Sequence, residues 1–334
     1  MMPVKHTKKA LITGIAGQDG SYLAEFLLSE GYEVHGIVRR IAIEDTEHKL
    51  KNLTHLLDRI HLHVASLDNV LSMIKIIKDL VPDECYHLAA SSFVSYSFED
   101  EISILNNNVN NTHYLLAAIR EFAPDCRVYF AGTSEMFGTV LHAPQNEDTP
   151  FNPRSIYGIS KMASYHLLKN YREQYGMFAC SGILYNHESP RRGYEFVTRK
   201  IVSSAVKIKR GLQQKLTLGN LDARRDWGFA PDYVRAMWLM LQAKAPDDYV
   251  VATGEMHTVR EFVETTFSCL GLDYREYVVV DPQFYRPTEK VELCGNPGKI
   301  EKKLGWARSK SFVEIIELMV ENEMRLYSEM TGLL

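Results

Sequence analysis

The chain of 334 residues, 46% of them hydrophobic, is long enough to bury one large core or two smaller ones. Its formal net charge of -4 forms no block of like charge, so we expect no nucleic-acid partner. Its five cysteines are widely spaced, so we expect reduced thiols. No apolar stretch approaches the ~20 residues that a membrane-spanning helix needs, so we expect no membrane partner. The first residues lack the apolar part of an export signal, so we expect a cytoplasmic location.

The first part of the chain carries the pattern of a nucleotide-binding unit. An apolar run at residues 10–12, which we predict to be a strand, leads through a glycine-rich stretch into a helical pattern at residues 21–30. Gly14, Gly17 and Gly20 recur every third residue, and this spacing permits a tight turn, close approach of the backbone to a pyrophosphate and close packing of the helix. The helix N-terminus would then face the anion, so the stretch predicts a dinucleotide site.

The second predicted strand, residues 33–38, ends at two arginines. An NAD-binding site usually has an acidic residue near this point, where it binds the ribose 2′-hydroxyl, whereas this sequence has Arg39 and Arg40. Guanidinium groups suit a 2′-phosphate, so we favour NADP over NAD. The alternative is that both arginines are solvated loop charges.

Apolar runs and helical patterns alternate along the next part of the chain, which predicts an α/β fold with a parallel, doubly wound sheet of Rossmann type. Small residues at 88–92 follow a strand, so the backbone there can lie against the cofactor. Further buried strands are expected at residues 60–64, 84–88, 128–131 and 179–184, with helices at residues 70–80 and 104–120.

The next segment carries residues suited to acid/base chemistry. Tyr157 and Lys161 lie four residues apart near the start of a long helix, which gives them the same face, and a Lys ammonium there can lower the pKa of a phenol. Thr133 adds a small donor and acceptor, and Glu135 adds a second acid or base at the end of a strand. Two bases suggest two proton transfers. The simpler interpretation is an exposed Tyr beside a solvated Lys.

The second half of the chain contains polar residues that could hold a diphosphate. A loop at residues 185–193 carries a pair of arginines, and Lys200, Arg225 and Arg286 follow it, while Glu289 could accept hydrogen bonds from ribose hydroxyls. Taken singly, each is more simply a surface charge or one half of an ion pair.

Histidine and acidic residues give no sign of a metal site in the sequence. As a lone histidine, His187 is expected to be structural or hydrogen-bonding rather than catalytic. No cluster of His, Asp and Glu has metal-ligand spacing, so we predict no metal.

A strand expected at residues 248–253 should return to the main sheet, so the second half of the chain is interleaved with the first. An amphipathic helix at residues 311–327 is expected to pack against the protein. The division we expect is a dinucleotide-binding domain of residues 1–184 with a returning part near 228–254, and a smaller, interleaved substrate domain of residues 185–227 and 255–334.

With these motifs together, the chain resembles the extended short-chain dehydrogenase/reductases, which include nucleotide-sugar epimerases and dehydratases, and within them the GDP-mannose 4,6-dehydratase family. The similarity runs over nearly the whole chain, and its most specific part is His-Glu-Ser-Pro-Arg-Arg-Gly at residues 187–193. The other segments that carry it are residues 11–14, 17–28, 197–200 and 225–228, with Arg286, Pro287 and Glu289.

The resemblance implies roles for individual residues and a homo-oligomer, either a dimer or a tetramer. The catalytic residues would be Thr133, Glu135, Tyr157 and Lys161. The GDP-sugar substrate would be bound by Ser134, Asn186, Lys200, Arg225, Arg286 and Glu289. The cofactor, NADP, would be bound by Gly14, Gly17, Gln18, Asp19, Gly20, Arg39, Ser66, Leu67, Leu88, Ala89, Ala90, Ser92, Tyr157, Lys161, His187 and Arg192.

The reaction implied by the resemblance is an internal redox cycle that converts GDP-mannose to GDP-4-keto-6-deoxymannose. Tyr157 would remove the C4 hydroxyl proton while C4 gives a hydride to NADP⁺, Glu135 would take the C5 proton, water would leave from C6, and the hydride would return to C6. Lys161 and Thr133 would stabilise the charge. The alternatives are a GDP-manno-heptose as substrate, a GDP-4-keto-6-deoxy-sugar reductase, which would have no use for Glu135, and a nucleotide-binding protein without catalysis.

Overall fold

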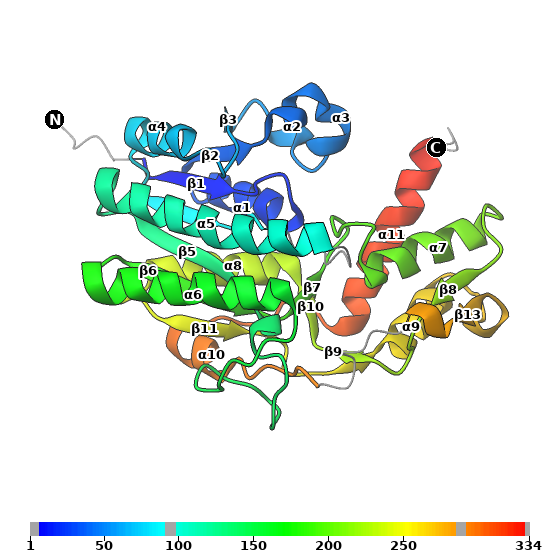
Figure 1. Cartoon of the computed structure of the whole chain (residues 1–334). Helices are drawn as coiled ribbons and strands as arrows, with labels where there is room; N and C mark the ends of the chain where they lie inside the picture. Colours follow the sequence, from blue (N-terminus) through cyan, green and yellow to red (C-terminus); the bar gives the residue numbers. More distant parts are fainter. Residues whose placement is uncertain (1–6, 91–97, 285–291, 331–334) are drawn as a thin grey trace.

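A seven-stranded parallel sheet forms the centre of the protein (Figure 1). The computed structural model describes residues 7–90, 98–284 and 292–330. The strand order β11-β6-β5-β4-β1-β2-β3 is that of a doubly wound dinucleotide-binding sheet with one strand added at the β6 edge, so the predicted fold class is confirmed. The strands are β1 (Lys9–Thr13), β2 (Glu33–Val38), β3 (His61–Val64), β4 (Glu84–His87), β5 (Arg127–Thr133), β6 (Ala179–Leu184) and β11 (Asp248–Val251).

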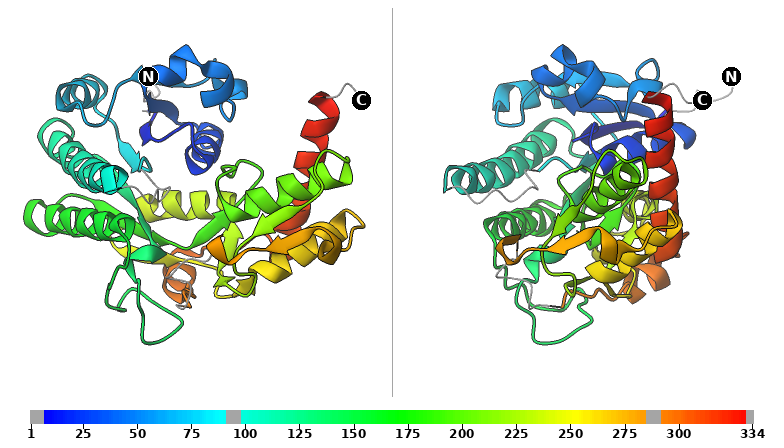
Figure 2. Two further views of the ribbon diagram at one scale, coloured as in Figure 1. Left: turned by 45° about the vertical axis from the view of Figure 1, so that its right-hand side comes forward. Right: turned by 90° about the vertical axis from the view of Figure 1, so that its right-hand side faces the viewer.

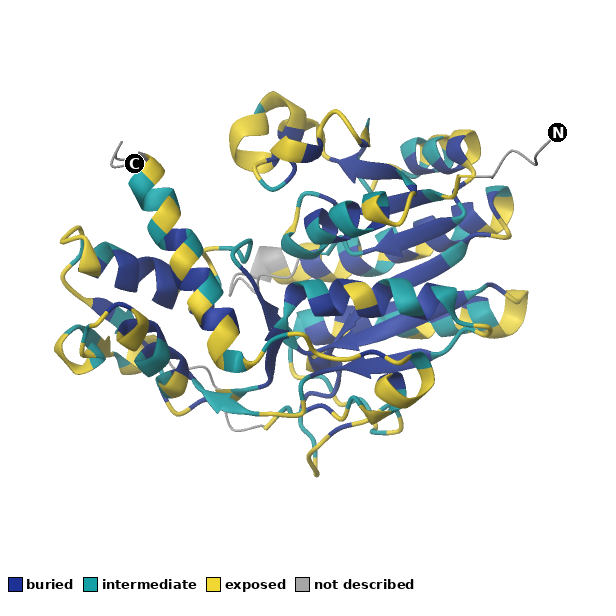
Figure 3. Cartoon of the chain, turned by 180° about the vertical axis from the view of Figure 1, so that it is seen from behind, coloured by how far each residue is buried: buried dark blue, intermediate teal, exposed yellow. Residues whose placement is uncertain are grey.

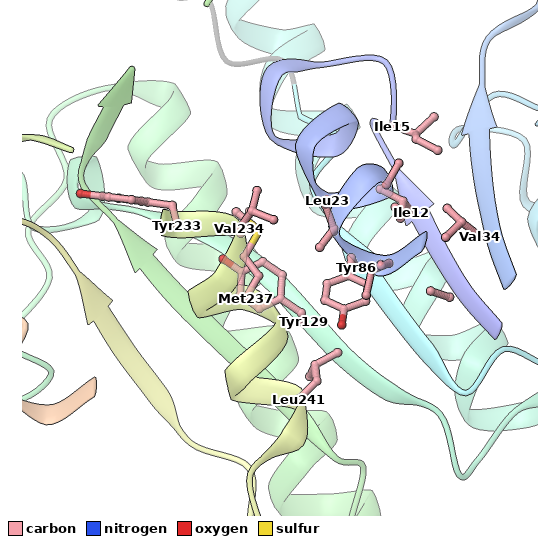
Figure 4. Packing of buried hydrophobic residues seen from close by; sticks show 14 of the residues in the cluster. Ile12, Ile15, Leu23, Val34, Tyr86, Tyr129, Tyr233, Val234, Met237 and Leu241 are labelled. Atoms are coloured by element: carbon pink, nitrogen blue, oxygen red, sulfur yellow. The ribbon is translucent and has the colours of Figure 1, made fainter. Parts of the chain in front are cut away.

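Helices cover both faces of this sheet, because its strands bury alternate side chains on opposite faces. Figure 4 shows one of these layers, where Leu23 and Met237 from two helices pack beside Tyr129 of the sheet. The covering helices are α1 (Gln18–Ser29) and α8 (Ala230–Gln242) on this face, and α4 (Val70–Leu80), α5 (Phe98–Phe122) and α6 (Ile156–Tyr175) on the other. With both faces covered, the carboxyl ends of the strands are where a ligand would bind.

The remaining chain builds a smaller unit beside the sheet, with an apolar cluster of its own (Figure 2). Its helices are α7 (Val197–Lys209), α9 (Val259–Cys269) and α11 (Phe312–Met330), and β8 (Leu216–Leu218) pairs with β13 (Val278–Val280). The predicted packing of the last helix is confirmed, since Ile316 and Met319 are fully buried in this cluster. The other short elements are α2 (Arg40–Glu44), α3 (Thr46–Lys49), η1 (Thr54–Leu56), η2 (Ser134–Met136), β7 (Asn186–Glu188), β9 (Arg224–Arg225), β10 (Trp227–Phe229), β12 (His257–Thr258), η3 (Tyr274–Glu276), η4 (Pro282–Phe284) and α10 (Gly298–Leu304).

Strand β11 returns to the central sheet after the chain has passed through the smaller unit, as predicted. Asp248 fixes it there, because its carboxylate accepts two hydrogen bonds from the Arg172 guanidinium, at 2.9 and 2.7 Å. The same carboxylate accepts from the Tyr165 hydroxyl at 2.9 Å and from the Ser181 backbone N at 3.1 Å. A paired and fully hydrogen-bonded carboxylate tolerates its burial at the sheet edge.

A later segment also packs back against the central sheet. Ile300 of α10 and Trp306 are buried in the cluster formed by α1 and α8, and Trp306 Nε1 donates to the Asp232 carbonyl at 2.7 Å. The chain beyond residue 255 is therefore divided between the two units, whereas the sequence division assigned all of it to the smaller one.

Several predicted elements match the structure, while two differ in a physically informative way. The predicted bounds of β2, α4 and β6 are those observed. Strand β3 was expected to be buried, but His61 and Val64 are exposed, because β3 is an edge strand paired only with β2. Residues 186–188, expected within a loop, form β7, whose backbone pairs with β10. Figure 3 shows the contrast between the buried interior of the sheet and the exposed periphery.

None of the described helices has both the length and the apolar character needed to cross a membrane.

Candidate active site

The glycine-rich turn joins β1 to α1 at the carboxyl end of the sheet. Gly14 has a φ of +76°, and a Cβ there would lie 3.0 Å from the backbone N of Ala89 on the neighbouring segment. A Cβ at Gly20 would lie 2.3 Å from the Gly14 carbonyl oxygen, so only glycine lets α1 approach the turn this closely. No side chain caps α1 at Gly17, which leaves backbone N–H groups at the helix N-terminus for an anion.

Asp19 adds a negative charge to the first turn of α1, and His187 balances it. His187 Nε2 donates to Asp19 Oδ2 at 2.9 Å, Nδ1 donates to the Tyr185 carbonyl at 2.7 Å, and the ring stacks on Tyr233. Desolvation opposes both charges, yet the ion pair lowers the pKa of Asp19 and raises the pKa of His187. The pair thus removes a charge that would repel a phosphate at this helix end.

The segment after His187 docks along α1. Gln18 Nε2 donates to the His187 carbonyl at 3.1 Å, and the Ser189 hydroxyl donates to Gln18 Oε1 at 2.8 Å. Arg191 Nη1 donates to the Ser21 hydroxyl at 3.1 Å. The side chains of Gln18 and Asp19, predicted at the cofactor, therefore hold the second half of the chain, and their backbone remains for a ligand.

The residues expected to carry chemistry come together where β5 ends and α6 begins. Thr133 closes β5, and its hydroxyl accepts a hydrogen bond from the Glu135 backbone N at 3.3 Å. Gly158 lets α6 lie against this turn, because a Cβ there would be 2.7 Å from the Glu135 carbonyl oxygen. A hydrogen bond with Thr133 and the charge of Glu135 both reach Tyr157, so three predicted catalytic residues adjoin.

Tyr157 and Lys161 lie one turn apart on α6, but their environment differs from the sequence expectation. Desolvation and the Glu135 charge raise the pKa of Tyr157 to about 12, against the hydrogen bond with Thr133. Desolvation lowers the pKa of Lys161 to about 7, and Lys161 Nζ donates to the Ala131 carbonyl at 2.8 Å. The expectation that Lys161 lowers the pKa of Tyr157 is therefore not met in this structure, because burial dominates both groups.

A buried hydrogen-bonded chain beneath these residues was missed by the sequence reasoning. His87 Nδ1 lies 2.8 Å from the Thr13 hydroxyl and Nε2 lies 3.1 Å from the Thr112 hydroxyl, while Thr13 also accepts from the Ala89 backbone N at 3.2 Å. Desolvation, with the nearby charge of Lys161, lowers the pKa of His87 to about 3. The sequence signal that could have revealed this hydrogen-bonded chain is a polar residue at the end of an apolar strand, such as Thr13 or His87.

Arg192 approaches the same site from the smaller unit. Its Nε lies 3.2 Å from Glu188 Oε2, and its guanidinium lies over the Phe196 ring, 3.7 Å from the centroid. Burial raises the pKa of Glu188, with the Arg192 charge opposing. The Arg192 charge also opposes the rise in the pKa of Tyr157 that burial causes, so Arg192 lies near the predicted catalytic group.

The predicted substrate residues that are described lie in or beside the smaller unit, except Ser134, which is buried under the end of β5. Lys200 Nζ donates to the Thr217 carbonyl at 2.8 Å, and Arg225 Nη1 donates to the neighbouring Arg224 carbonyl at 2.7 Å. Asn186 begins β7. The predicted site residues Ser92, Arg286 and Glu289 lie outside the described residues.

Asp226, next to Arg225, was not singled out from the sequence but fixes this region. It is 1% exposed and accepts from the Thr253 backbone N and hydroxyl at 2.8 and 2.7 Å, and from the Gly254 backbone N at 3.0 Å. Burial raises the pKa of Asp226 despite these hydrogen bonds. Asp226 thereby holds the segment that follows β11 against the segment that contains Arg225.

The two arginines after β2 differ in their contacts. Arg40 Nε donates to Glu44 Oε1 at 2.9 Å, whereas the Arg39 side chain is exposed and has no ion pair or hydrogen bond among the described residues. Ser66 and Leu67 follow the neighbouring strand β3 and are partly buried. Of the two arginines, Arg39 is thus the one available to bind a phosphate at the carboxyl end of β2.

Comparisons with known proteins identify the family and the fold of the chain. The family model for GDP-mannose 4,6 dehydratase matches residues 11–319. The chain is 48% identical to GDP-mannose 4,6 dehydratase 2 of Arabidopsis thaliana over 335 residues, which cover 97% of this chain and 88% of that one. It is 46% identical to GDP-mannose 4,6 dehydratase of Homo sapiens over 340 residues, 95% of this chain and 91% of that one. In fold it is similar to UDP-glucose 4-epimerase of Thermotoga maritima, with a TM-score of 0.84 and 23% identity over 96% of this chain and 99% of that one.

The low pKa of Lys161 predicts a pH dependence of stability. Its pKa is about 7 in the folded protein against 10.5 ordinarily, so the unfolded chain holds the extra proton between these values. The free energy of unfolding of the cofactor-free protein, relative to Lys161→Met, should therefore increase from pH 7 toward pH 10.5, by at most about 1.4 kcal/mol per pH unit. Urea unfolding at a series of pH values measures it. Lys169→Met, at a half-exposed lysine of the same helix, is the control, and parallel curves for Lys161→Met and the parent would contradict the assignment.

Proposed function

This chain belongs to the GDP-mannose 4,6-dehydratase family, and from that membership we propose how its residues divide the reaction. The enzyme is a hydro-lyase that converts GDP-mannose to GDP-4-keto-6-deoxymannose. The observation that supports this division of the reaction between residues is that Tyr157 lies near the exposed carboxyl of Glu135, beside the nucleotide-binding turn. A 4,6-dehydration needs two separate proton transfers, and these are two chemically distinct acid/base groups.

Tyr157 is assigned the C4 hydroxyl. Thr133 lies near the Tyr157 hydroxyl, where it opposes the rise in the pKa of Tyr157 that burial causes, and would support the C4 oxygen as its proton leaves. The raised pKa of Tyr157 means that its phenol keeps its proton, so a positive charge beside it is needed to favour the phenolate, the form that can accept the C4 proton. We assign that charge to Lys161 on the same helix face, although in this structure its ammonium donates to the Ala131 carbonyl and does not lower the pKa of Tyr157.

Glu135 is assigned the C5 proton and the loss of water at C6. Its side chain is exposed and has no ion pair or hydrogen bond within the described part of the chain, so it is free to turn toward a substrate. A ketone at C4 makes the neighbouring C5 proton acidic enough for a carboxylate to remove. A simple reductase acting at C4 would have no use for this second group.

NADP is the cofactor that the site takes, and the residues present fit it. The bare backbone cradle at Gly14, Gly17 and Gly20 suits a pyrophosphate, and Ala89 lies against the turn. Arg39 is available for the 2′-phosphate. When bound, NADP accepts a hydride from the sugar and returns it, so the cofactor is not consumed. The remaining members of the proposed cofactor site are Gln18, Asp19, Ser66, Leu67, Leu88, Ala90, Ser92, His187 and Arg192.

The GDP part of the substrate is assigned to the smaller unit. Cationic Lys200 and Arg225 suit the diphosphate, and Asn186 pairs with Trp227 of β10, two residues beyond Arg225. Ser134, Arg286 and Glu289 complete the proposed set. This division gives residues 1–184 and 228–254 to the cofactor and residues 185–227 and most of 255–334 to the sugar nucleotide.

We also assign the enzyme to the cytoplasm. All five cysteines are free thiols, and Cys85, Cys126 and Cys180 are buried. Free, buried thiols are typical of proteins from reducing compartments.

The division of labour predicts different outcomes for two substitutions. Tyr157→Phe should abolish oxidation at C4, whereas Glu135→Gln should oxidise C4 and then stall, so that reduced nicotinamide accumulates on the enzyme in the second variant only. Stopped-flow absorbance with GDP-mannose measures this. With the parent enzyme and GDP-mannose deuterated at C4, deuterium should appear at C6 of the product.

Net consumption of NADPH by the parent would instead assign it to the reductases. A GDP-manno-heptose is tested beside GDP-mannose as a second substrate. If the pocket selects mannose by shape, kcat/KM for the heptose should be roughly 10–200-fold lower than kcat/KM for GDP-mannose. The opposite preference would make the heptose the substrate.

The exposed position of Arg39 predicts the cofactor preference. Arg39→Ala should lose about 1–3 kcal/mol of the preference for NADP over NAD, because one charge-assisted hydrogen bond to the 2′-phosphate is removed. Isothermal titration calorimetry with both cofactors measures it, and Arg40→Ala is the matched control, since Arg40 is engaged with Glu44. Equal affinities of the parent for NADP and NAD would contradict the inference.

We propose that the enzyme is a homo-oligomer that associates through α5 and α6, a dimer or a tetramer. Ile102 and Leu105 on α5 and Ile159 on α6 are exposed apolar side chains on neighbouring helices. Sedimentation velocity should therefore give an oligomer for the parent and a monomer for Ile102→Asp combined with Leu105→Asp. Leu71→Asp, at an exposed leucine on α4, should leave the oligomer intact, and a monomeric parent would rule out the proposal.

A further inference from the structure

Four side chains from two neighbouring strands meet at the edge of the central sheet, outside the site described above. Glu33 and His35 belong to β2, and His61 and His63 belong to β3, which runs parallel beside it (Figure 1). The register sets His35 opposite His61. Side chains two residues apart on a strand share a face, so all four lie on the face that α4 covers.

The atoms that could bind a metal already face one another. His35 Nε2 lies 2.8 Å from Glu33 Oε1, and His61 Nε2 lies 4.0 Å from the same oxygen. One ligand atom from each of these three residues lies within 4.8 Å of the other two. Ligands of a tetrahedral zinc ion, at 2.0–2.1 Å from the metal, stand about 3.3 Å apart, so the exposed His61 would turn its ring out of the stack with His35 to bring the three atoms to that spacing.

His63 lies behind His35 and orients its ring. His63 Nε2 lies 3.0 Å from His35 Nδ1, which fixes the ring and leaves Nε2 directed at Glu33. His35 is 6% exposed, and its ring stacks on those of His61 and His63 with centroids 4.7 and 5.2 Å apart. A second residue that orients the ligating imidazole is a regular feature of metal sites.

The charges of the cluster also suit a cation. Glu33 is the one carboxylate among the three proposed ligands, so a bound cation would be paired with a negative charge. Lys9, opposite Glu33 on β1, is the cation nearest in register, and its Nζ is directed toward the Leu80 carbonyl, at 3.5 Å.

We propose that Glu33, His35 and His61 form a binding site for one divalent transition metal ion, with zinc as the probe. Two imidazoles and a carboxylate favour zinc, copper or nickel over magnesium or calcium, which prefer oxygen ligands. The exposed His61 gives the ion access from solvent and leaves a fourth position for water. The ion would join the edge strand β3 to β2. The site lies toward the amino ends of these strands, away from the catalytic groups at the carboxyl ends, so zinc would act on stability rather than on chemistry.

Calorimetric titration of the NADP-loaded enzyme with zinc chloride tests the proposal. The parent should bind one zinc per chain, His61→Asn should weaken the binding at least tenfold, and His63→Asn should weaken it by roughly 10–100-fold, as loss of a supporting residue does. His48→Asn is the matched control, because His48 is an exposed histidine paired with a carboxylate at 2.7 Å, and this variant should bind zinc as the parent does.

Two further measurements keep the test decisive. Cobalt in place of zinc should give the visible absorption of a four-coordinate ion in the parent and not in His61→Asn. Zinc should also raise the thermal unfolding midpoint of the parent more than that of either His61→Asn or Glu33→Gln. His61 and Glu33 are accessible enough for these variants to fold. Failure of the parent to bind zinc, equal binding by His61→Asn and His48→Asn, or equal binding of magnesium and zinc would each overturn the site and would leave the dehydratase assignment untouched.

Discussion

The buried ion pair between Asp19 and His187 is the contact on which the arrangement of the site depends. It joins the first turn of the first helix to the segment that opens the smaller unit, 168 residues later along the chain. The His187 ring also lies flat on Tyr233 of α8. Three elements that the sequence keeps far apart are thereby fixed around one imidazole. The same pair makes the helix end acceptable to a phosphate, so it serves the fold and the ligand together.

Close backbone approaches, rather than long side chains, position the groups that we propose to react. Gly14 and Gly20 bring α1 onto its turn, and Gly158 brings α6 onto the Glu135 backbone. A methyl group at any of these positions would meet backbone atoms, which cannot move aside as a flexible side chain could. The distance between Tyr157 and Glu135 is consequently set by main-chain packing, which is the kind of support that holds catalytic groups in register.

The sequence was most informative where chemistry and structure depend on neighbours along the chain. Tyr157 and Lys161 could be recognised because four residues make one helical turn, and the strands could be found from apolar runs of typical length. Their pKa values could not be predicted, because burial, not spacing, decides them. His87 and Asp248 depend on partners in distant elements, and no local pattern marks such pairs. The exposure of β3 follows from its place at the sheet edge, which only the topology determines.

The return of β11 to the sheet also has a consequence for how the chain is made. Residues up to 184 are synthesised first and contain six of the seven strands, yet β6 has no outer neighbour until residues 248–251 emerge. During that interval an apolar strand offers its unpaired backbone to any other chain, and such open edges promote aggregation. A nascent chain must therefore complete the first part of its smaller unit before its central sheet can gain its last strand. Ribosome-bound intermediates of this enzyme are candidates for chaperone protection.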